Sequence, residues 1–347
     1  MKREQVLILA STPLHLLGAV VFASLYSEAF ESTLVLLDQR DTTYYDAVQQ
    51  SLHASPFKAL HMLHLKPQGL FRKIAARRAN YSLLQKIVSA NQPTMILTGN
   101  DRNIAFEYAM RIAAANGLSP EGAYLDDGLH SYLPQRLKWY QYTLLDRVLQ
   151  RLVYGRKTPI PRQIGDHPWI EACYLFRPQS ALGHLQKRPC FALESAILRS
   201  EATTRYLKRL TASLESDITL HKAPGRLLIL PHPSVKKAIP HYRKIVEKLF
   251  DTPKPIYVKL HPRDDGRFEE ALCSRHPKAT LLPSRIAIEL LLFGLSVEEV
   301  YGMQSTALLT LAWLDPKLRI YNIQKAATQI PIFEAEGITQ LTPEALL

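Results

Sequence analysis

Cysteine and long apolar runs are both scarce in this chain, and each shortage excludes a class of protein. The three cysteines, Cys173, Cys190 and Cys273, are scattered, and no pair has the C-x-x-C spacing of a zinc or redox site. A disulfide-based scaffold is therefore excluded, and a reducing, cytoplasmic setting is the simplest interpretation. No stretch of about 20 uninterrupted apolar residues occurs, so we predict no membrane-spanning helix.

Several common ligand-binding motifs are also missing. The chain has no P-loop, no G-x-G-x-x-G and no G-x-S-x-G. It has no D-x-D pair to hold a divalent ion, so we expect neither a metal site nor a bound cofactor. Lys2 and Arg3 precede the apolar run Val6–Ala10, as in a secretory signal, but Ser11-Thr12-Pro13 interrupts the run and a first β-strand fits better.

What the chain does have is a large apolar fraction and a basic balance of charge. Hydrophobic residues make up 47% of its 347 residues, which is enough for a large core, and the length favours two domains. The formal net charge of +12 attracts phosphate-rich or acidic partners: nucleic acid, anionic lipid, acidic glycans or nucleotide sugars. Charge alone does not choose among them.

Short apolar runs alternate with stretches of helical periodicity, which is the pattern of parallel sheets covered by helices on both faces. In the first half we predict strands at Val6–Ala10, Ser32–Asp38, Thr94–Thr98 and Gly122–Leu125, and helices at Leu14–Ala29, Tyr44–His53, Leu83–Ala90 and Ile104–Asn116. In the second half we predict strands at Leu227–Leu230, Ile256–Leu260, Thr280–Leu282, Glu299–Tyr301 and Arg319–Ile320, and helices at Pro240–Phe250, Ile286–Phe293 and Thr306–Leu314.

Residues 160–190 carry several prolines and little clear period, so we predict that they cross between two domains, 1–160 and 161–347. Two Rossmann-type α/β domains facing a cleft form a GT-B-like fold. Ligands of open α/β sheets bind beyond the carboxyl ends of the strands, where the motifs below are placed.

Two acids and a glycine follow the predicted strand Gly122–Leu125. Adjacent side chains on a strand point to opposite faces, so Asp126 and Asp127 cannot do the same job. One can face the cleft as a general base while the other pairs locally, and Gly128 lets the chain turn sharply. An ordinary Asp-Gly turn, which is common, has the same sequence.

A second cluster closes the predicted strand Ile256–Leu260. Lys259 and His261 are two residues apart and so share a face, where an ammonium and an imidazole form a phosphate site. His261 could also donate a proton to a departing phosphate, and Pro262 stops the strand. The alternative is a surface lysine beside a capping histidine.

A third cluster, Gly302-Met303-Gln304-Ser305-Thr306, lies between a predicted strand and a predicted helix. Ser305 is a good N-cap residue, and a helix N-terminus with nearby hydroxyls binds anions through its backbone N–H groups and dipole. Ordinary helix capping would give the same sequence, so both interpretations stay open.

Other polar positions are looser candidates. Glu289, at the start of an apolar helix, could accept hydrogen bonds from ribose hydroxyls or could complement the helix dipole. Asn100 and Asp101 follow a predicted strand and could hold an acceptor or donor sugar or cap the next helix. We assign no catalysis to His232, because prolines on both sides indicate a rigid loop.

Taken together, these elements resemble the bacterial sialyltransferases, especially glycosyltransferase family 52 and its polysialyltransferase relatives. That superfamily has an acid-acid-Gly motif, then a His-Pro motif, then a Ser-Ser/Thr motif, and Asp126-Asp127-Gly128, His261-Pro262 and Ser305-Thr306 occur here in that order. Ser11-Thr12-Pro13-Leu14-His15 is similar to the T-P-L-Q after the first strand of family 52, with His15 in place of Gln. The resemblance runs from about residue 6 to 320 by motif order and spacing.

The resemblance implies a GT-B fold and an enzyme that transfers sialic acid from CMP-sialic acid with inversion and without a metal. The acceptor would be a lipooligosaccharide, capsule or other galactoside or sialoside glycan, which could be lipid-linked. Asp127 would be the base on the acceptor-side domain, and His261 would be the acid and a phosphate ligand on the CMP-sugar domain. The remaining implied substrate-binding residues are Lys259, Ser305, Thr306, Glu289, Pro262, Gly302, Asn100, Asp101 and Thr12.

Two alternative functions remain, and one segment predicts contact with a membrane. Another CMP-sugar, such as CMP-Kdo, would need the same phosphate site. A nucleic-acid binder is suggested by the basic run from Phe71 to Tyr81, but this run also fits a solvated helix face, and we expect no nucleic-acid partner. The basic, aromatic segment Lys138–Arg162 predicts peripheral contact with the inner face of an anionic membrane, or else a linker helix.

Overall fold

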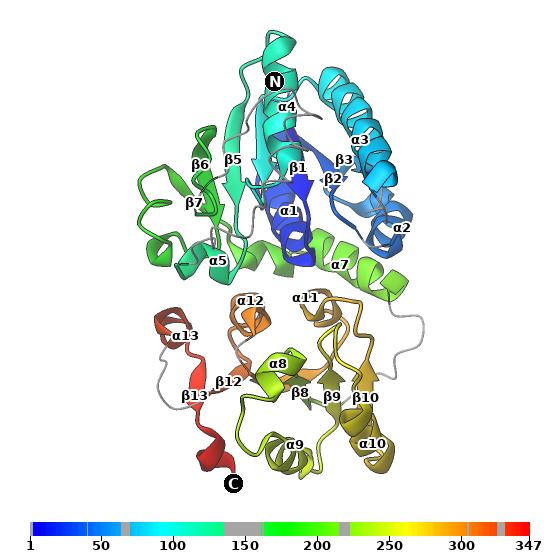
Figure 1. Ribbon diagram of the computed structural model, residues 1–347, viewed down its shortest axis with the longest axis vertical. Coiled ribbons are helices and arrows are strands. Elements are labelled where there is room, and N and C mark those ends of the chain that lie inside the picture. Colours follow the sequence, from blue (N-terminus) through cyan, green and yellow to red (C-terminus); the bar gives the residue numbers. More distant parts are fainter. Residues whose placement is uncertain are drawn as a thin grey trace. The chain divides into compact units, whose positions relative to one another are not determined.

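The computed structural model describes residues 3–39, 41–63, 70–134, 161, 163–214, 223–303, 305–324 and 330–347. The chain divides into two compact units, residues 1–206 and 207–347. Each unit is an α/β structure in which helices connect the strands of a sheet (Figure 1). The GT-B-like fold class predicted from the sequence is confirmed in its two essentials, the two units and their parallel sheets.

In the described part of the first unit, seven strands form one sheet in the order β3-β2-β1-β4-β5-β6-β7. The strands are β1 (Glu4–Ala10), β2 (Phe30–Leu36), β3 (Phe57–Met62), β4 (Met95–Thr98), β5 (Glu121–Leu125), β6 (Ile170–Leu175) and β7 (Cys190–Ala192). The helices are α1 (Pro13–Leu25), α2 (Thr43–Gln50), α3 (Leu70–Asn91), α4 (Ile104–Ala115), α5 (Leu129–Tyr132) and α7 (Glu201–Leu214), which runs across the division between the units. Strand β1 pairs in parallel with β2 and β4, which explains why Val6–Ala10 is apolar and buried throughout.

In the described part of the second unit, six strands form a sheet in the order β10-β9-β8-β11-β12-β13. The strands are β8 (Gly225–Ile229), β9 (Ile256–Lys259), β10 (Ala279–Leu282), β11 (Val297–Gly302), β12 (Arg319–Ile323) and β13 (Thr339–Leu341). The helices are α8 (Pro233–Lys236), α9 (Tyr242–Phe250), α10 (Arg267–Arg275), α11 (Ile288–Leu291), α12 (Thr306–Leu314) and α13 (Pro331–Ala335). Helix α9 packs Ile245, Val246 and Leu249 into a core with Leu228 and Val258 of the sheet.

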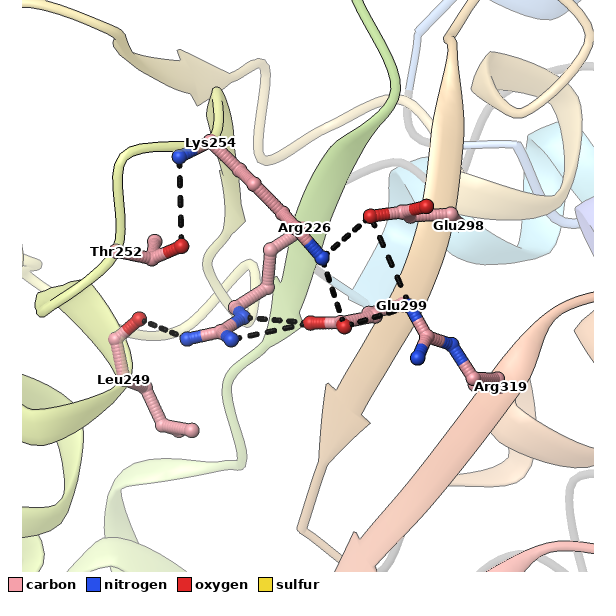
Figure 2. A network of polar contacts seen from close by, with 7 residues as sticks. All are labelled: Arg226, Leu249, Thr252, Lys254, Glu298, Glu299 and Arg319. Atoms are coloured by element: carbon pink, nitrogen blue, oxygen red, sulfur yellow. Dashed lines mark hydrogen bonds and ion pairs between the residues drawn. The ribbon is translucent and has the colours of Figure 1, made fainter.

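Glu299 of β11 is the centre of an ion network at the amino ends of the strands in the second unit (Figure 2). Its carboxylate accepts hydrogen bonds from Arg226 of β8 (3.1 and 3.0 Å), Lys254 (2.9 Å) and Arg319 of β12 (2.8 Å). Burial by itself would raise the pKa of Glu299, but the bonds from Lys254 and Arg226 outweigh it and lower the pKa. The network joins the neighbouring strands β8, β11 and β12 and lies at the end of the sheet opposite His261 and Ser305, so its role is structural.

The boundary between the units lies later than the sequence predicted. We expected a division at residue 160 with 160–190 as a crossover, but β6 and β7 extend the first sheet and the division falls after Tyr206. Ile170, Cys173 and Leu175 of β6 are buried, so this stretch gains more from pairing with β5 than its prolines suggest. The C-terminal unit is correspondingly smaller than the predicted domain 161–347.

The predictions about membrane contact and basic segments can be compared with the structure only in part. Among the described residues, no helix combines the length and apolar character that crossing a bilayer requires. The basic segment Lys138–Arg162 falls, apart from Pro161, outside the described residues, so its membrane contact stays a prediction. The basic run from Phe71 to Tyr81 belongs to the long helix α3, and the expectation of no nucleic-acid partner stays a prediction.

Candidate functional site

In the first unit, the predicted base lies where three neighbouring strands end. Strands β1, β4 and β5 are adjacent in the sheet and parallel, so their carboxyl ends meet at one edge. His15 comes from the first turn of α1 after β1, Gly99 follows β4, and Asp127 follows β5. The fold therefore brings together side chains that are more than a hundred residues apart in the chain.

Asp127 makes a direct side-chain contact with His15 at this edge. The Oδ1 atom of Asp127 lies 2.7 Å from the Nε2 atom of His15. The side chain of His15 is 1% exposed, whereas that of Asp127 is 15% exposed. Asp127 thus keeps access to solvent while its partner is enclosed, which is the arrangement expected of a carboxylate that meets a substrate.

Asp126 is turned away from this contact and buried. Its carboxylate accepts hydrogen bonds from the N–H groups of Gly128 (2.8 Å) and Phe176 (2.9 Å), and from the hydroxyls of Ser131 (3.1 Å) and Tyr132. Burial raises the pKa of Asp126 to about 6, although these donors act in the opposite direction. Asp126 therefore pairs locally and fixes the turn after β5, as the alternation along the strand predicted, and Gly128 makes that turn with a φ of 62°.

Asp101, predicted to contact a sugar, is placed elsewhere. It is buried, at 2% exposure, and its carboxylate accepts a hydrogen bond from the N–H of His167 at 2.9 Å. Burial is the main reason that its pKa is raised. Asp101 therefore anchors the loop before β6, and its contact with a sugar stays a prediction.

Asn100 and Thr12 each accept a hydrogen bond from a nearby backbone N–H, and both side chains remain accessible to solvent. The Oδ1 atom of Asn100 accepts a hydrogen bond from the N–H of Arg102 at 3.1 Å, and the capping residue of α4 is Asn103. Thr12 is exposed and caps α1, with its hydroxyl accepting a hydrogen bond from the N–H of His15 at 3.2 Å. Both residues stay candidates for substrate contact.

In the second unit, the predicted phosphate-binding residues also meet at one sheet edge. Strands β9, β8 and β11 are adjacent and parallel. His261 follows β9, His232 follows β8, and Ser305 follows β11. Their positions after the carboxyl ends of three adjacent strands match the usual location of ligands in open α/β sheets.

The two histidines of this edge contact each other. The imidazole rings of His232 and His261 pack edge to face, with centroids 4.8 Å apart. In each ring Nδ1 accepts a backbone hydrogen bond, from the N–H of Ser234 (3.1 Å) and of Arg263 (3.2 Å) respectively. In the neutral rings, the proton is therefore on Nε2, which is the nitrogen left to donate to a ligand.

The surroundings of His261 favour its neutral form. Its pKa is lowered by burial first, and then by the neighbouring His232 and Arg263. Protonation of Nδ1 would also cost the hydrogen bond from Arg263. At neutral pH, His261 is therefore set up to donate a hydrogen bond from Nε2–H.

Lys259 and Glu289 interact with each other electrostatically, and neither side chain is fully exposed. Lys259 is buried, and its ammonium donates to the carbonyl oxygens of Pro283 (2.9 Å) and Ser284 (2.8 Å). Burial lowers the pKa of Lys259 to about 8, against the opposing effect of Glu289. Burial likewise raises the pKa of Glu289, and Lys259 opposes this. Lys259 thus holds the loop before α11, where Glu289 lies.

The third motif forms a helix N-terminus, as predicted. Ser305 caps α12 by accepting a hydrogen bond from the N–H of Ala307 at 3.3 Å, and Thr306 begins the helix. A side chain at Gly302 would meet Leu308 at 2.7 Å, so glycine lets β11 approach α12 closely. Pro262 is exposed directly after His261. The edge thus offers imidazole N–H groups and a capped helix N-terminus to an anion.

A basic pocket of about 900 Å³ borders the loops that carry the two histidines. Its basic lining residues are Lys236, Lys237, Arg243, Lys244, Arg263 and Arg267. Lys236 is paired with Glu269 at 2.7 Å, and the hydroxyl of Tyr242 donates to the same carboxylate at 2.6 Å. The excess of cations suits an anionic ligand.

Sequence reasoning missed His15 and His232 as members of these clusters. From the sequence, His15 is only a replacement of Gln, and the flanking prolines of His232 argue against catalysis. For His232 a signal was available: a His-Pro dipeptide follows both β8 and β9, at equivalent strand ends. For His15, only the order of the strands brings it to Asp127.

Comparison with solved structures identifies the class of fold. The chain is similar to a UDP-GlcNAc 2-epimerase from Neisseria meningitidis bound to UDP-GlcNAc, with a TM-score of 0.53, 11% identity, and 97% of this chain and 87% of that chain covered. A further UDP-N-acetylglucosamine 2-epimerase gives 0.52 at 12% identity, covering 98% and 84%. The enzyme of that name from Rickettsia bellii gives 0.50 at 12%, covering 93% and 80%. At these identities the likeness establishes the GT-B-like fold.

The sequence comparison identifies the kind of enzyme. Residues 232–321, about a quarter of the chain, match the alpha-2,8-polysialyltransferase (POLYST) family, whereas no curated protein matches the sequence. The matched segment contains His232, His261, Ser305 and Thr306. The protein is therefore a glycosyltransferase, and the matched segment of its second unit is similar to the sialyltransferases that its motifs predicted.

Proposed function

We propose that the protein transfers sialic acid from CMP-sialic acid to a hydroxyl of a glycan acceptor, with inversion and without a metal ion. The observation that carries the proposal is the convergence of His232, His261 and the α12 N-terminus on one edge of the matched segment. Such donors suit the single phosphate of a CMP-sugar.

The first unit supplies the base. The second oxygen of the Asp127 carboxylate, Oδ2, accepts the proton of the acceptor hydroxyl as the hydroxyl oxygen attacks the anomeric carbon of the donor. A bond forms between the acceptor oxygen and the anomeric carbon, and the bond from that carbon to the CMP phosphate breaks. The electron pair leaves with CMP. Attack from the side opposite the phosphate inverts the anomeric centre.

The second unit stabilises the departing CMP. Charge develops on the phosphate as the bond breaks, and donors aimed at that charge lower the barrier. Nε2–H of His261, Nε2–H of His232 and the N–H groups at the start of α12 are suitable donors. The second ionisation of a phosphate monoester lies at a pKa of about 6, so CMP can leave without taking a proton. We therefore assign His261 the role of hydrogen-bond donor in preference to that of acid.

The test is direct. The protein is incubated with CMP-sialic acid and a panel of galactoside and sialoside acceptors, and products are identified by mass. Transfer of one or more sialic acid residues is the expected outcome, and Asp127→Asn is the matched inactive control. If no acceptor gains mass while the protein binds CMP, the donor assignment is wrong.

A second donor, such as CMP-Kdo, is the alternative that the same site favours, because both sugars are carried by CMP. The two are separated by running each donor with the same acceptors. The acceptor could be lipid-linked, as lipooligosaccharide and capsule acceptors are. A lipid-linked acceptor would be consistent with peripheral membrane contact through residues 138–162.

A further inference from the structure

We propose that His15 is a positioning residue for the general base. The inference rests on the proposed role of Asp127 and adds a second residue to it. Asp127 lies at the end of a strand, where a carboxylate with no partner would rotate among several orientations. The 2.7 Å contact with His15 holds one of its oxygens in place.

The hydrogen bonds around the imidazole determine which nitrogen faces Asp127. The backbone N–H of Ser11 donates to Nδ1 of His15 at 3.3 Å, so Nδ1 is an acceptor and carries no proton. The proton of the neutral ring is then on Nε2, which donates to Oδ1 of Asp127. Because both ring nitrogens have a partner, the ring has one orientation and one tautomer.

The enclosure of the ring removes its remaining freedom. His15 is 1% exposed, and a Cβ atom placed on Gly99 would lie 2.3 Å from its Cδ2 atom, so the ring packs directly against the backbone after β4. The hydroxyl of Thr12 accepts a hydrogen bond from the backbone N–H of His15. The segments that follow three adjacent strands therefore contribute to one support: His15 after β1, Gly99 after β4 and Asp127 after β5.

The support leaves the second carboxylate oxygen, Oδ2, for the acceptor hydroxyl. During transfer that oxygen takes the proton, while His15 keeps its own proton and its bond to Oδ1. A fixed carboxylate raises the fraction of encounters with reactive geometry, and a misplacement of about 1 Å can cost 10²-fold in rate. His15 therefore acts on the rate of transfer and not on donor binding.

Two amide substitutions test separately the hydrogen bonds made by Nδ1 and Nε2 of His15. In His15→Gln the amide occupies the position of Nε2 and can donate to Asp127. In His15→Asn it occupies the position of Nδ1, can still accept from Ser11, and is too short to reach Asp127. We expect His15→Asn to lower kcat about 10- to 100-fold with CMP affinity unchanged, and His15→Gln to stay within about 5-fold of the wild type.

A readout independent of activity tests the contact itself. Nitrogen NMR of histidine-labelled protein should show His15 with its proton on Nε2, and Asp127→Ala should shift that signal. The proposal is overturned if the proton is on Nδ1, if His15→Asn transfers at the wild-type rate, or if His15→Gln is as slow as His15→Asn. If the wild type transfers nothing from CMP-sialic acid, the proposed function fails, and the NMR result still decides whether His15 holds Asp127.

Discussion

Asp126 and Asp127 are adjacent in the chain, yet Asp126 is buried among backbone and hydroxyl donors while Asp127 contacts His15 and solvent. The difference follows from the alternation of side chains in the extended chain, which continues past the end of β5 and turns neighbouring residues to opposite faces. The Asp126 carboxylate stabilises the turn, and the Asp127 carboxylate is the proposed general base.

Substitutions of Asp127 and Asp126 should therefore have different effects, the first on the rate of transfer and the second on stability. Asp127→Asn should cut transfer by roughly two to four orders of magnitude with CMP affinity unchanged, because a general base acts only on the acceptor. Asp126→Ala should instead lower the melting temperature, because it leaves the donors of Gly128, Ser131, Tyr132 and Phe176 without their acceptor. Calorimetry with CMP, initial rates and thermal melts measure the three quantities. A folded Asp127→Asn that transfers at the wild-type rate would exclude Asp127 as the base.

Asp126 should also make stability depend on pH. Its pKa is raised from 3.8 to about 6 in the folded protein, so between these values the folded state binds the proton more tightly than the unfolded state. Its contribution is complete below about pH 4 and is lost as the pH rises through about 6. The stability of the wild type relative to Asp126→Asn should fall by roughly 2 kcal/mol from pH 4 to pH 7. Urea unfolding of both proteins at each pH measures this difference, and a difference that rises with pH would contradict the burial argument.

The histidine pair should control CMP binding. His261→Ala and His232→Ala should each weaken CMP affinity and slow transfer together, because a phosphate contact exists before and during bond breaking. A loss of about 1.5 kcal/mol, or roughly tenfold, is expected for each donor to a charged group. Titration calorimetry of the two variants beside Asp127→Asn, which should bind CMP normally, gives the comparison. Unchanged affinity in both variants would place the phosphate elsewhere.

Glu299 should stabilise the second unit through the network of Figure 2. Glu299→Gln should cost about 3 kcal/mol, because it leaves Arg226, with only 14% side-chain exposure, without its anion. Glu298→Gln is the matched control and should cost less than about 1 kcal/mol, because that side chain is 37% exposed. The lowered pKa of Glu299 means that its contribution is present above the ordinary carboxyl pKa and is lost as the pH falls through the folded value. Unfolding free energies of both variants at neutral and acid pH are the measurement.

Metal independence is the last expectation. Imidazole N–H groups and a helix N-terminus are proposed to stabilise the charge on the departing phosphate, so chelation should not matter. Transfer should continue at the full rate after treatment with EDTA. Activity that is lost in EDTA and restored by Mg²⁺ or Mn²⁺ would refute this part of the mechanism.

The sequence by itself determined the local elements and the order of the motifs. Apolar runs such as Val6–Ala10 and the helix Thr306–Leu314 were predictable, because burial on both faces of a parallel sheet and helical capping leave a direct pattern in the residues. The contrast between Asp126 and Asp127 was predictable for a similar reason, since alternation along a strand depends only on local geometry.

Only the tertiary structure decided which of these elements are neighbours. Strand order places β1, β4 and β5 side by side and β8 beside β9, and with them His15 near Asp127 and His232 against His261. It also assigned β6 and β7 to the first sheet and buried Asp101 beneath the loop that holds His167. These outcomes depend on contacts between residues far apart in the chain, whose free energy comes from packing and leaves no period in the local sequence.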